Sequence, residues 1–438
     1  MAELTRRARR EVEIGALAHD GRGVARIDGK AVFVAGALPG ERVEIEITRR
    51  RRHLDEARLV AVLAASPDRV EPRCAHFGVC GGCSLQHLAS DAQLAAKQTQ
   101  LLEDLERIGR VRPAALLAPL RGPPFGYRRR ARLGIRYVRK KGRVLAGFRE
   151  RDAPYLADLS RCEVLVSGFA TLPRDLAALV EGLSIRERVP QVELAVADSA
   201  AALVFRVMDP PNAADLGQLA EFGRRVGAAV YLQPGGLDSV RPLGEAPPLA
   251  YAVDDGAVRI EFTPVDFVQV NAPLNEAMVG AALAALEPDP ADRVLDLFCG
   301  LGNFTLPLAR RAAQVVGVEG DPGLVERARH NARRNGIDNA SFHVANLFDP
   351  ASFGDWAAAR PDLVLLDPPR AGARELAVRL ADWRPRRVVY ISCHPGSLAR
   401  DAGILVGAGA YELAAAGVMD MFPQTTHVEA IAVFERRR

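Results

Sequence analysis

The hydrophobic pattern changes character twice along the chain of 438 residues. Residues 11–64 alternate apolar and polar positions in short stretches that are separated by turn signals such as Asp28-Gly29. Alternation of this kind predicts five short strands, and five strands in so few residues suit a small OB-like β-barrel. We expect this first domain to span residues 1–66.

The middle of the chain mixes one helical pattern with several strand patterns. Residues 88–109 repeat apolar positions at helical spacing and end at Gly109, which predicts a helix that stops there. Strand-like runs separated by stretches rich in Pro and Gly follow, so we expect residues 67–262 to form a β-rich middle domain. The apolar face of the expected helix comprises Leu94, Leu101, Leu102, Leu105 and Ile108.

From residue 263 onward, continuous apolar strands alternate with helical segments. This alternation predicts a parallel sheet that helices cover on both faces. The expected fold is therefore a Rossmann-like α/β domain over residues 263–438, preceded by the barrel and the middle domain. The expected strands are 293–298, 314–319, 340–345, 362–367 and 387–392, with two terminal strands near 411–418 and 428–434.

Composition is that of an ordinary globular protein, with 49% apolar and 26% charged residues and a net charge of +4. The charge is unevenly distributed, because twelve Lys and Arg but one acidic residue lie between Arg121 and Arg151. Such a run on an otherwise acidic chain predicts a binding site for a polyanion such as RNA, although a solvated strand face is the alternative. Tyr127, Tyr137 and Phe148 could stack on unpaired bases or pack in a core.

Nothing in the sequence predicts a membrane partner. No run of 18 apolar residues exists, so a membrane-spanning helix is not expected. We expect a cytoplasmic protein whose six cysteines are reduced. Clustered cysteines are therefore interpreted first as metal ligands or catalytic groups, and only then as disulfides.

The first expected strand of the last domain ends in a glycine loop. Gly300-x-Gly302 follows Asp296, and Glu319 ends the next strand, where it could accept hydrogen bonds from ribose hydroxyls. A dinucleotide oxidoreductase is the alternative, but the third glycine of that fingerprint is missing, since Asn303-Phe304-Thr305 follow Gly302. The pattern favours an S-adenosylmethionine site. The third strand ends near Asn346 and the fourth at Asp367-Pro368-Pro369-Arg370.

A cysteine at the end of the next strand selects the chemistry. Asp367 with two prolines could also serve methylation of an amino group, but Cys393 adds a thiol to the same sheet edge. Carbon 5 of uracil is a poor nucleophile until a thiolate adds to carbon 6. A base must then remove the carbon 5 proton, and Glu429 is the candidate. Cys299, inside the glycine loop, is expected to pack in the core.

A second group of cysteines lies in the middle domain. Cys74, Cys80 and Cys83 form a tight loop, and Cys162 is the remaining cysteine of this domain. Four thiolates suit zinc or an iron–sulfur cluster. Three clustered cysteines with one distant partner favour the cluster, because structural zinc usually uses two short paired spacings.

These motifs together resemble a known family over nearly the whole chain. Residues 5–65 resemble a TRAM module, and FVQVN (267–271), DLFCGLGNF, LDPPRAG, SCHPGSLARD and DMFPQTTHVE follow in the family order. The sequence is similar to the bacterial RNA 5-methyluridine methyltransferases, and most similar to the branch that acts on 23S ribosomal RNA. That branch carries an N-terminal TRAM domain and an iron–sulfur cluster.

The resemblance implies roles for individual residues. Cys393 would be the nucleophile and Glu429 the proton acceptor. Three positions depart from the family pattern, since His394 replaces the usual Asn, and Gln424 and Thr426 replace the usual His and Gly. The implied contacts with the methyl donor are Gln269, Phe298, Asn303, Glu319, Asn346 and Asp367, and the implied [4Fe–4S] ligands are Cys74, Cys80, Cys83 and Cys162.

We therefore expect a monomeric, cytoplasmic enzyme that transfers a methyl group from S-adenosylmethionine to carbon 5 of a uridine in 23S rRNA. The expected fold is a C-terminal class I methyltransferase domain with the two preceding domains binding RNA. Transfer RNA or another ribosomal site is the alternative substrate. Two other classes stay open, an amino-group methyltransferase and a non-catalytic RNA-binding assembly factor.

Overall fold

The computed structural model describes residues 9–358 and 360–437, so the first eight residues of the predicted first domain lie outside it. The chain forms two compact units. The first unit holds the chain up to Lys97 together with Arg149–Tyr155 and Pro423–Thr426, and the second unit holds the rest. The predicted boundaries at residues 66 and 262 stay predictions.

The first unit contains a six-stranded sheet whose strand order is β1-β5-β6-β4-β3-β2. Its inward-facing side chains, among them Val32, Val34, Val43 and Ile45, are fully buried because apolar residues alternate with polar ones along each strand. One strand more than predicted is present. The strands are β1 (Arg9–Glu13), β2 (Ala16–Leu17), β3 (Gly23–Ile27), β4 (Lys30–Ala35), β5 (Arg42–Arg50) and β6 (Leu54–Ala64).

The predicted helix over 88–109 is two elements. Helix α1 (Ser90–Asp104) is followed by a π-helical turn, η1 (Leu105–Gly109), which ends at the predicted glycine. The prediction that Ile108 lies on the buried face is wrong, because its side chain is 51% exposed. A π-turn takes more residues than an α-turn, so side chains after it no longer follow the 3.6-residue repeat.

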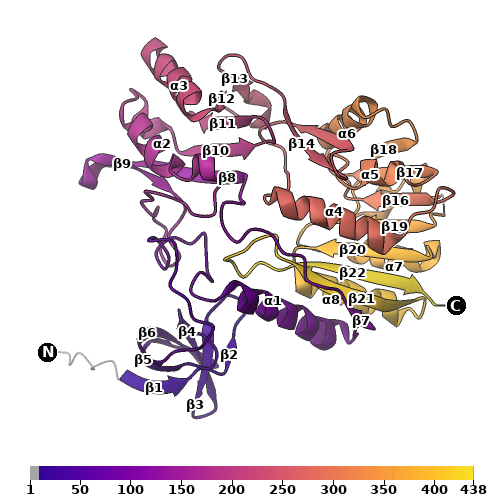
Figure 1. Ribbon diagram of the computed structural model, residues 1–438, viewed down its shortest axis with the longest axis horizontal. Coiled ribbons are helices and arrows are strands. Elements are labelled where there is room, and N and C mark those ends of the chain that lie inside the picture. The colour runs from indigo at the N-terminus through magenta and orange to yellow at the C-terminus, as the bar shows by residue number, and fades with distance from the viewer. Residues whose placement is uncertain (1–8, 359, 438) are drawn as a thin grey trace. The chain divides into compact units, whose positions relative to one another are not determined.

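The basic strand predicted from Tyr127 onward lies in a second, mixed sheet within the second unit. This six-stranded sheet has the order β13-β12-β11-β10-β8-β9, with β11 and β12 parallel. Helices α2 (Leu172–Glu181) and α3 (Ala213–Val226) accompany it (Figure 1). Its strands are β8 (Arg130–Val138), β9 (Arg143–Gly147), β10 (Gln191–Val196), β11 (Ala201–Arg206), β12 (Ala229–Gln233) and β13 (Arg241–Pro242).

The last part of the chain builds an eight-stranded sheet with the order β18-β17-β16-β19-β20-β22-β21-β7. The five strands from β18 to β20 are parallel, as predicted, whereas β22 pairs antiparallel with both β20 and β21. The strands are β16 (Arg293–Leu297), β17 (Gln314–Glu319), β18 (Ala340–Val344), β19 (Leu363–Leu366), β20 (Arg387–Ser392), β21 (Tyr411–Met419), β22 (Glu429–Arg436) and β7 (Ala115–Leu116).

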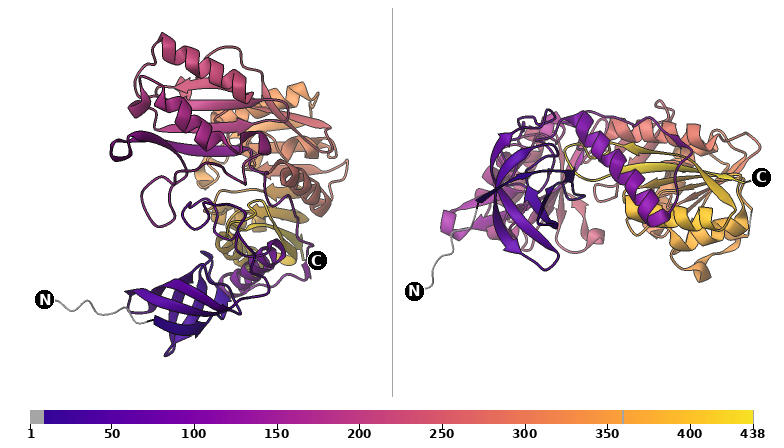
Figure 2. Two further views of the ribbon diagram at one scale, coloured as in Figure 1. Left: turned by 60° about the vertical axis from the view of Figure 1, so that its left-hand side comes forward. Right: turned by 90° about the horizontal axis from the view of Figure 1, so that it is seen from below.

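Helices cover both faces of this sheet. Helix α4 (Ala272–Leu286) lies on one face, and α7 (Arg374–Trp383) and α8 (Pro395–Gly407) lie on the other (Figure 2). Helices α5 (Thr305–Ala309) and α6 (Pro322–Arg334) follow β16 and β17, and a two-stranded ribbon, β14 (Leu249–Val253) and β15 (Val258–Phe262), precedes α4. Strand residues such as Leu365, Val389 and Ile391 are fully buried, as expected for strands enclosed from both sides.

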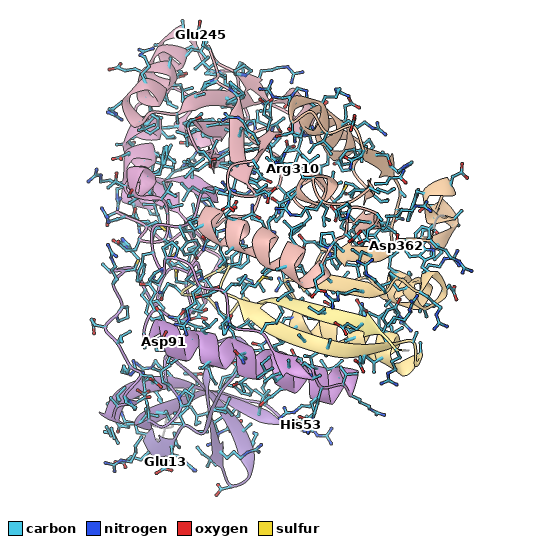
Figure 3. The ribbon with its side chains drawn as sticks, turned by 45° about the vertical axis from the view of Figure 1, so that its right-hand side comes forward. Glu13, His53, Asp91, Glu245, Arg310 and Asp362 are labelled. Atoms are coloured by element: carbon cyan, nitrogen blue, oxygen red, sulfur yellow. The ribbon has the colours of Figure 1, made fainter. Side chains whose placement is uncertain are left out.

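The amino ends and the carboxyl ends of the parallel strands carry different side chains. At the amino ends of the strands, Asp362 (Figure 3) accepts a hydrogen bond from the backbone amide of Arg293, which stitches β19 to β16. The carboxyl ends instead carry the motifs singled out in the sequence. No helix in the described part of the chain is long and apolar enough to cross a membrane.

Candidate active site

All eight residues implied to bind the donor or to act on uracil line one cavity of about 600 Å³ in the second unit. They reach it from the carboxyl ends of the five neighbouring parallel strands, from the start of antiparallel β22 and from the segment before α4. Ligands of open α/β sheets bind at this edge. The residues are Gln269, Phe298, Asn303, Glu319, Asn346, Asp367, Cys393 and Glu429.

The glycine loop after β16 depends on left-handed backbone conformations. Phe298, Gly300 and Gly302 have φ of 65°, 54° and 92°, a region that glycine adopts readily and that is rare for a phenylalanine. The carboxylate of Glu319 accepts hydrogen bonds from the amides of Gly300 (3.2 Å) and Gly320 (2.6 Å). Glu319 thus holds the loop while its remaining lone pairs can meet a ligand.

A polar network behind the cavity holds Asn303. The hydroxyl of Tyr251 donates to Asn303 Oδ1 (3.0 Å), and Asn275 exchanges two hydrogen bonds with the Asn303 amide, at 3.0 and 3.1 Å. All three side chains are thereby fixed before any ligand binds. Sequence reasoning missed Tyr251, which also lines the cavity, because it lies inside an apolar strand and carries no motif.

Arg129, which directly precedes basic strand β8, belongs to the same network. Its guanidinium lies over the ring of Tyr251 at 4.7 Å from the centroid, and its Nε donates to the backbone carbonyl of Gln269 (3.0 Å). The side chain is buried, and a cation over an aromatic face in such a place stabilises the arrangement. Arg129 therefore positions the cavity wall and is not available to phosphate.

Burial favours the protonated forms of three groups in the cavity, Cys393, Glu429 and Asp367. Burial raises the pKa of the Cys393 thiol to about 11, and the neighbouring carboxyls of Glu429 and Asp367 add to that effect. Burial also raises the pKa of Glu429 well above its ordinary value and that of Asp367 to about 7. Arg370, which sequence reasoning named only as part of a motif, lines the cavity and lowers the thiol pKa.

The strand beneath the cavity carries one further buried acid. Asp296 accepts a hydrogen bond from the Thr305 hydroxyl (2.5 Å), but its Oδ1 has no partner in the described structure. Burial raises the pKa of Asp296 to about 7. Cys299 is buried against Gly317, which agrees with the expected packing role, and burial raises its pKa as well.

His394, one of the three departures from the family pattern, caps helix α8. Its Nδ1 accepts a hydrogen bond from the Ser397 amide (3.1 Å). A neutral imidazole can accept a hydrogen bond as an asparagine carbonyl does. The other two departures lie in the first unit, where Gln424 exchanges hydrogen bonds with Gln93 (2.9 and 3.0 Å) and the Thr426 amide donates to the Ser84 hydroxyl (3.0 Å).

The cysteines implied as cluster ligands are divided between the units. Cys74, Cys80 and Cys83 belong to the first unit and Cys162 to the second. Two hydrogen bonds that each involve a side chain hold the loop, since the Gly82 amide donates to the sulfur of Cys80 (3.4 Å) and the Arg151 guanidinium donates to the carbonyl of Cys83. Within residues 9–358 and 360–437, no group of three or more Cys, His, Asp or Glu is arranged to hold a metal ion. The chemistry of the four thiols alone fits a cluster.

Comparisons with known proteins cover the whole chain. Family models for a TRAM domain, a methyltransferase domain and a tRNA (uracil-5-)-methyltransferase match residues 3–60, 288–373 and 355–437. The chain is 53% identical over 425 residues to the 23S rRNA (uracil(1939)-C(5))-methyltransferase RlmD of Methylococcus capsulatus, covering 97% of this chain and 96% of that protein. It is 52% identical over 431 residues to the RlmD of Stenotrophomonas maltophilia, covering 98% and 97%.

A solved structure resembles the chain throughout. The tRNA (uracil-54, C5)-methyltransferase of Pyrococcus abyssi, in complex with S-adenosyl-L-homocysteine, superposes with a TM-score of 0.74 and 26% identity, covering 97% of this chain and 99% of that one. The predicted fold class, a C-terminal Rossmann-like methyltransferase domain with a TRAM module at the N-terminus, is thereby confirmed.

Proposed function

The chain belongs to the RlmD family of 23S rRNA uracil-C5 methyltransferases, and from this premise we propose that it transfers a methyl group from S-adenosylmethionine to carbon 5 of a uridine in 23S rRNA. The single observation that carries the proposal is the cavity, which brings Cys393 and Glu429 together with all six implied donor contacts. The substrate RNA and the relatives' names favour action in the cytoplasm. The monomeric state stays a prediction.

In the proposed mechanism, Cys393 acts first. Its sulfur, once deprotonated, adds to carbon 6 of a uracil that has left its stack, and the electron pair of the double bond makes carbon 5 nucleophilic. Bound in the cavity, S-adenosylmethionine would supply the methyl carbon on a sulfonium, whose positive charge favours the ionised forms of the nearby thiol and carboxyls.

Glu429 acts second. After carbon 5 is methylated, Glu429 accepts the carbon 5 proton, the double bond re-forms, and the carbon–sulfur bond to Cys393 breaks. Because burial raises the pKa of both groups, each must lose its proton before it acts. The proposal thus requires the thiolate of Cys393 and the carboxylate of Glu429 in a cavity where burial disfavours both ionised forms.

We propose that Arg136, Lys140 and Lys141, in and near the turn of the β8–β9 hairpin, contact RNA phosphates, and not the whole basic run. Several of its cations are already paired with acids, including Arg132 with Glu193 (3.1 Å) and Arg139 with Glu187 (2.8 Å). By contrast, Arg136, Lys140 and Lys141 are exposed and have no acidic partner within 4 Å among the described residues. Unpaired cations are the ones that release counterions from a nucleic acid.

The covalent step gives the direct test. The protein is incubated with S-adenosylmethionine and 23S rRNA fragments in which 5-fluorouridine replaces uridine, and adducts are mapped by mass spectrometry. Fluorine cannot leave as a cation, so the ring should remain bonded to the Cys393 sulfur. Cys299→Ala serves as the thiol control. Turnover on unmodified RNA without any adduct at Cys393 would overturn the mechanism.

We further propose that Cys74, Cys80, Cys83 and Cys162 hold an iron–sulfur cluster. The support is the number and spacing of the thiols and the family resemblance, not the geometry, and no catalytic step depends on it. Anaerobically purified protein should contain about four iron ions per chain, and Cys74→Ser should lose them while Cys299→Ala keeps them. A colourless preparation that contains zinc would refute the cluster.

A further inference from the structure

We propose that Arg400 and Asp401, in helix α8, are positioning residues that hold the loop of residues 368–373 and thereby keep Arg370 at the wall of the cavity that Cys393 also lines. The inference rests on the proposed function, because it gives Arg370 a task at the reacting thiol. Neither Arg400 nor Asp401 lines the cavity, so both act through the loop.

Asp401 is a fully buried carboxylate with an unusually complete set of partners. Its Oδ2 accepts hydrogen bonds from the Tyr390 hydroxyl and the Ala373 amide, both at 2.7 Å, and its Oδ1 accepts from Arg400 Nε (2.8 Å). Taking a charge out of water is costly unless such partners replace the lost hydration. The surrounding groups are therefore arranged to solvate this carboxylate, and the loop supplies one of the hydrogen-bond donors, the Ala373 amide.

Arg400 fastens the same loop from the other side of the carboxylate. Its Nη2 donates to the carbonyl of Ala371 (2.9 Å) while the guanidinium also pairs with Asp401 at 2.7 Å. Ala371 and Ala373 are thus fixed by two consecutive residues of one helix. Because Ala371 follows Arg370 directly and Ala373 lies only two residues further on, little freedom is left to the backbone of Arg370.

The residue between these two anchors shows how tightly the loop is held. Gly372 has a φ of 79°, a left-handed conformation that side chains disfavour. A Cβ added there would lie 2.6 Å from Asp401 Oδ2 and 2.7 Å from Arg400 Nη2. The loop therefore approaches the Arg400–Asp401 pair more closely than any residue but glycine permits.

The same elements place the nucleophile. Tyr390, which donates to Asp401, lies in β20, and Cys393 follows that strand and precedes the His394 cap of α8. Arg370 and Cys393 are therefore positioned from one common support. Of the charged groups that act on the Cys393 thiol, Glu429 and Asp367 raise its pKa and Arg370 lowers it. If Arg370 were displaced, a smaller fraction of Cys393 would be ionised at a given pH.

Alkylation of Cys393 tests the inference without RNA or donor. The full-length protein is treated with iodoacetamide from pH 6 to 10, and modification of Cys393 is followed by mass spectrometry. We expect Arg370→Met and Arg400→Met each to slow alkylation at pH 8 by about 3- to 10-fold. The double variant should be no slower than Arg370→Met, because both changes remove the same interaction between Arg370 and the Cys393 thiol.

Two further variants keep the test decisive. Arg188→Met removes an exposed ion pair with Asp209 and should leave alkylation unchanged. If Arg400→Met fails to fold, Tyr390→Phe removes only the hydroxyl bonded to Asp401 and should slow alkylation about twofold. Unchanged alkylation in folded Arg400→Met, or additive effects in the double variant, would overturn the inference. A missing fluorouridine adduct in the unsubstituted protein would instead refute the proposed function.

Discussion

The β8–β9 hairpin and the cavity use charged side chains in opposite ways. In the hairpin, most charges are neutralised by acids from neighbouring segments, as in the pairs of Arg132 with Glu193 and Arg139 with Glu187. In the cavity, Glu429 is buried and Asp367 half-buried, neither has a cationic partner within 4 Å among the described residues, and their pKa values rise. The groups that we propose to react are thus the ones without a cationic partner among the described residues, and a count of charges along the sequence does not locate them.

The largest expected effect comes from the cavity. Cys393→Ala should reduce methyl transfer to 23S rRNA by at least about 10⁴-fold, because the covalent route to an activated carbon 5 is lost. The measurement is incorporation of labelled methyl groups, with donor affinity by calorimetry as the control, which should stay unchanged. Activity within tenfold of the parent would show that the thiol is not the nucleophile.

The raised pKa values predict a strong dependence on pH. In the proposed mechanism Cys393 and Glu429 act only after losing protons, and both have raised pKa values. The value of kcat/KM for RNA should therefore increase from pH 6 to pH 9, by up to about tenfold per pH unit for each group that titrates. Adduct formation with 5-fluorouridine RNA needs the thiolate but no loss of a carbon 5 proton, so its dependence should be less steep. If adduct formation and kcat/KM depended equally steeply on pH, Glu429 would not be the group that accepts the carbon 5 proton.

The hairpin can be tested with variants of matched charge. Replacing Arg136, Lys140 and Lys141 by Gln should weaken RNA binding by about tenfold or more and lower the salt slope by about two, since each contact with a single strand contributes about 0.7. Arg143 is paired with Asp158, so the control replaces the paired residues Arg132, Arg139 and Arg143 by Gln, which removes the same charge. Equal losses in both triple variants would mean that pairing does not select the contacts.

The smallest expected effect concerns the network behind the cavity. Tyr251→Phe removes the hydroxyl that donates a hydrogen bond to Asn303 Oδ1. The loss of this hydrogen bond costs about 1 kcal/mol of the free energy that holds the Asn303 side chain in place. We expect donor affinity to fall about fivefold, measured by calorimetry, while RNA affinity is unchanged. A loss of RNA affinity with unchanged donor affinity would contradict the assignment of Asn303 to the donor.

The sequence predicted the cavity well because its signals are local. A continuous apolar run followed by a polar residue marks both a buried strand and the edge where the strand ends, so Glu319, Asp367 and Cys393 could be placed on one rim. The same logic predicted the parallel strands. Their register and the antiparallel insertion of β22 between β20 and β21 depend on contacts far apart in the chain and were not predicted.

The features that the sequence did not predict mostly depend on contacts between residues far apart in the chain. Tyr251 and Asn303 are separated by 52 residues, and nothing near either residue points to the other. The partners of Arg132 and Arg139 likewise come from a segment about 50 to 60 residues away, so the basic run looked more available than it is. Ile108 was misplaced because a π-turn shifts the helical phase, which no residue in that stretch announces.

The discontinuous first unit limits how the protein can be dissected. Its residues up to Lys97 are joined by Arg149–Tyr155 and by Pro423–Thr426, and the last of these segments is anchored by the Gln93–Gln424 amide pair. A gene fragment that ends near residue 97 would encode a module stripped of two of its own pieces. Exchange of this module between relatives would thus have to transplant three stretches of chain together.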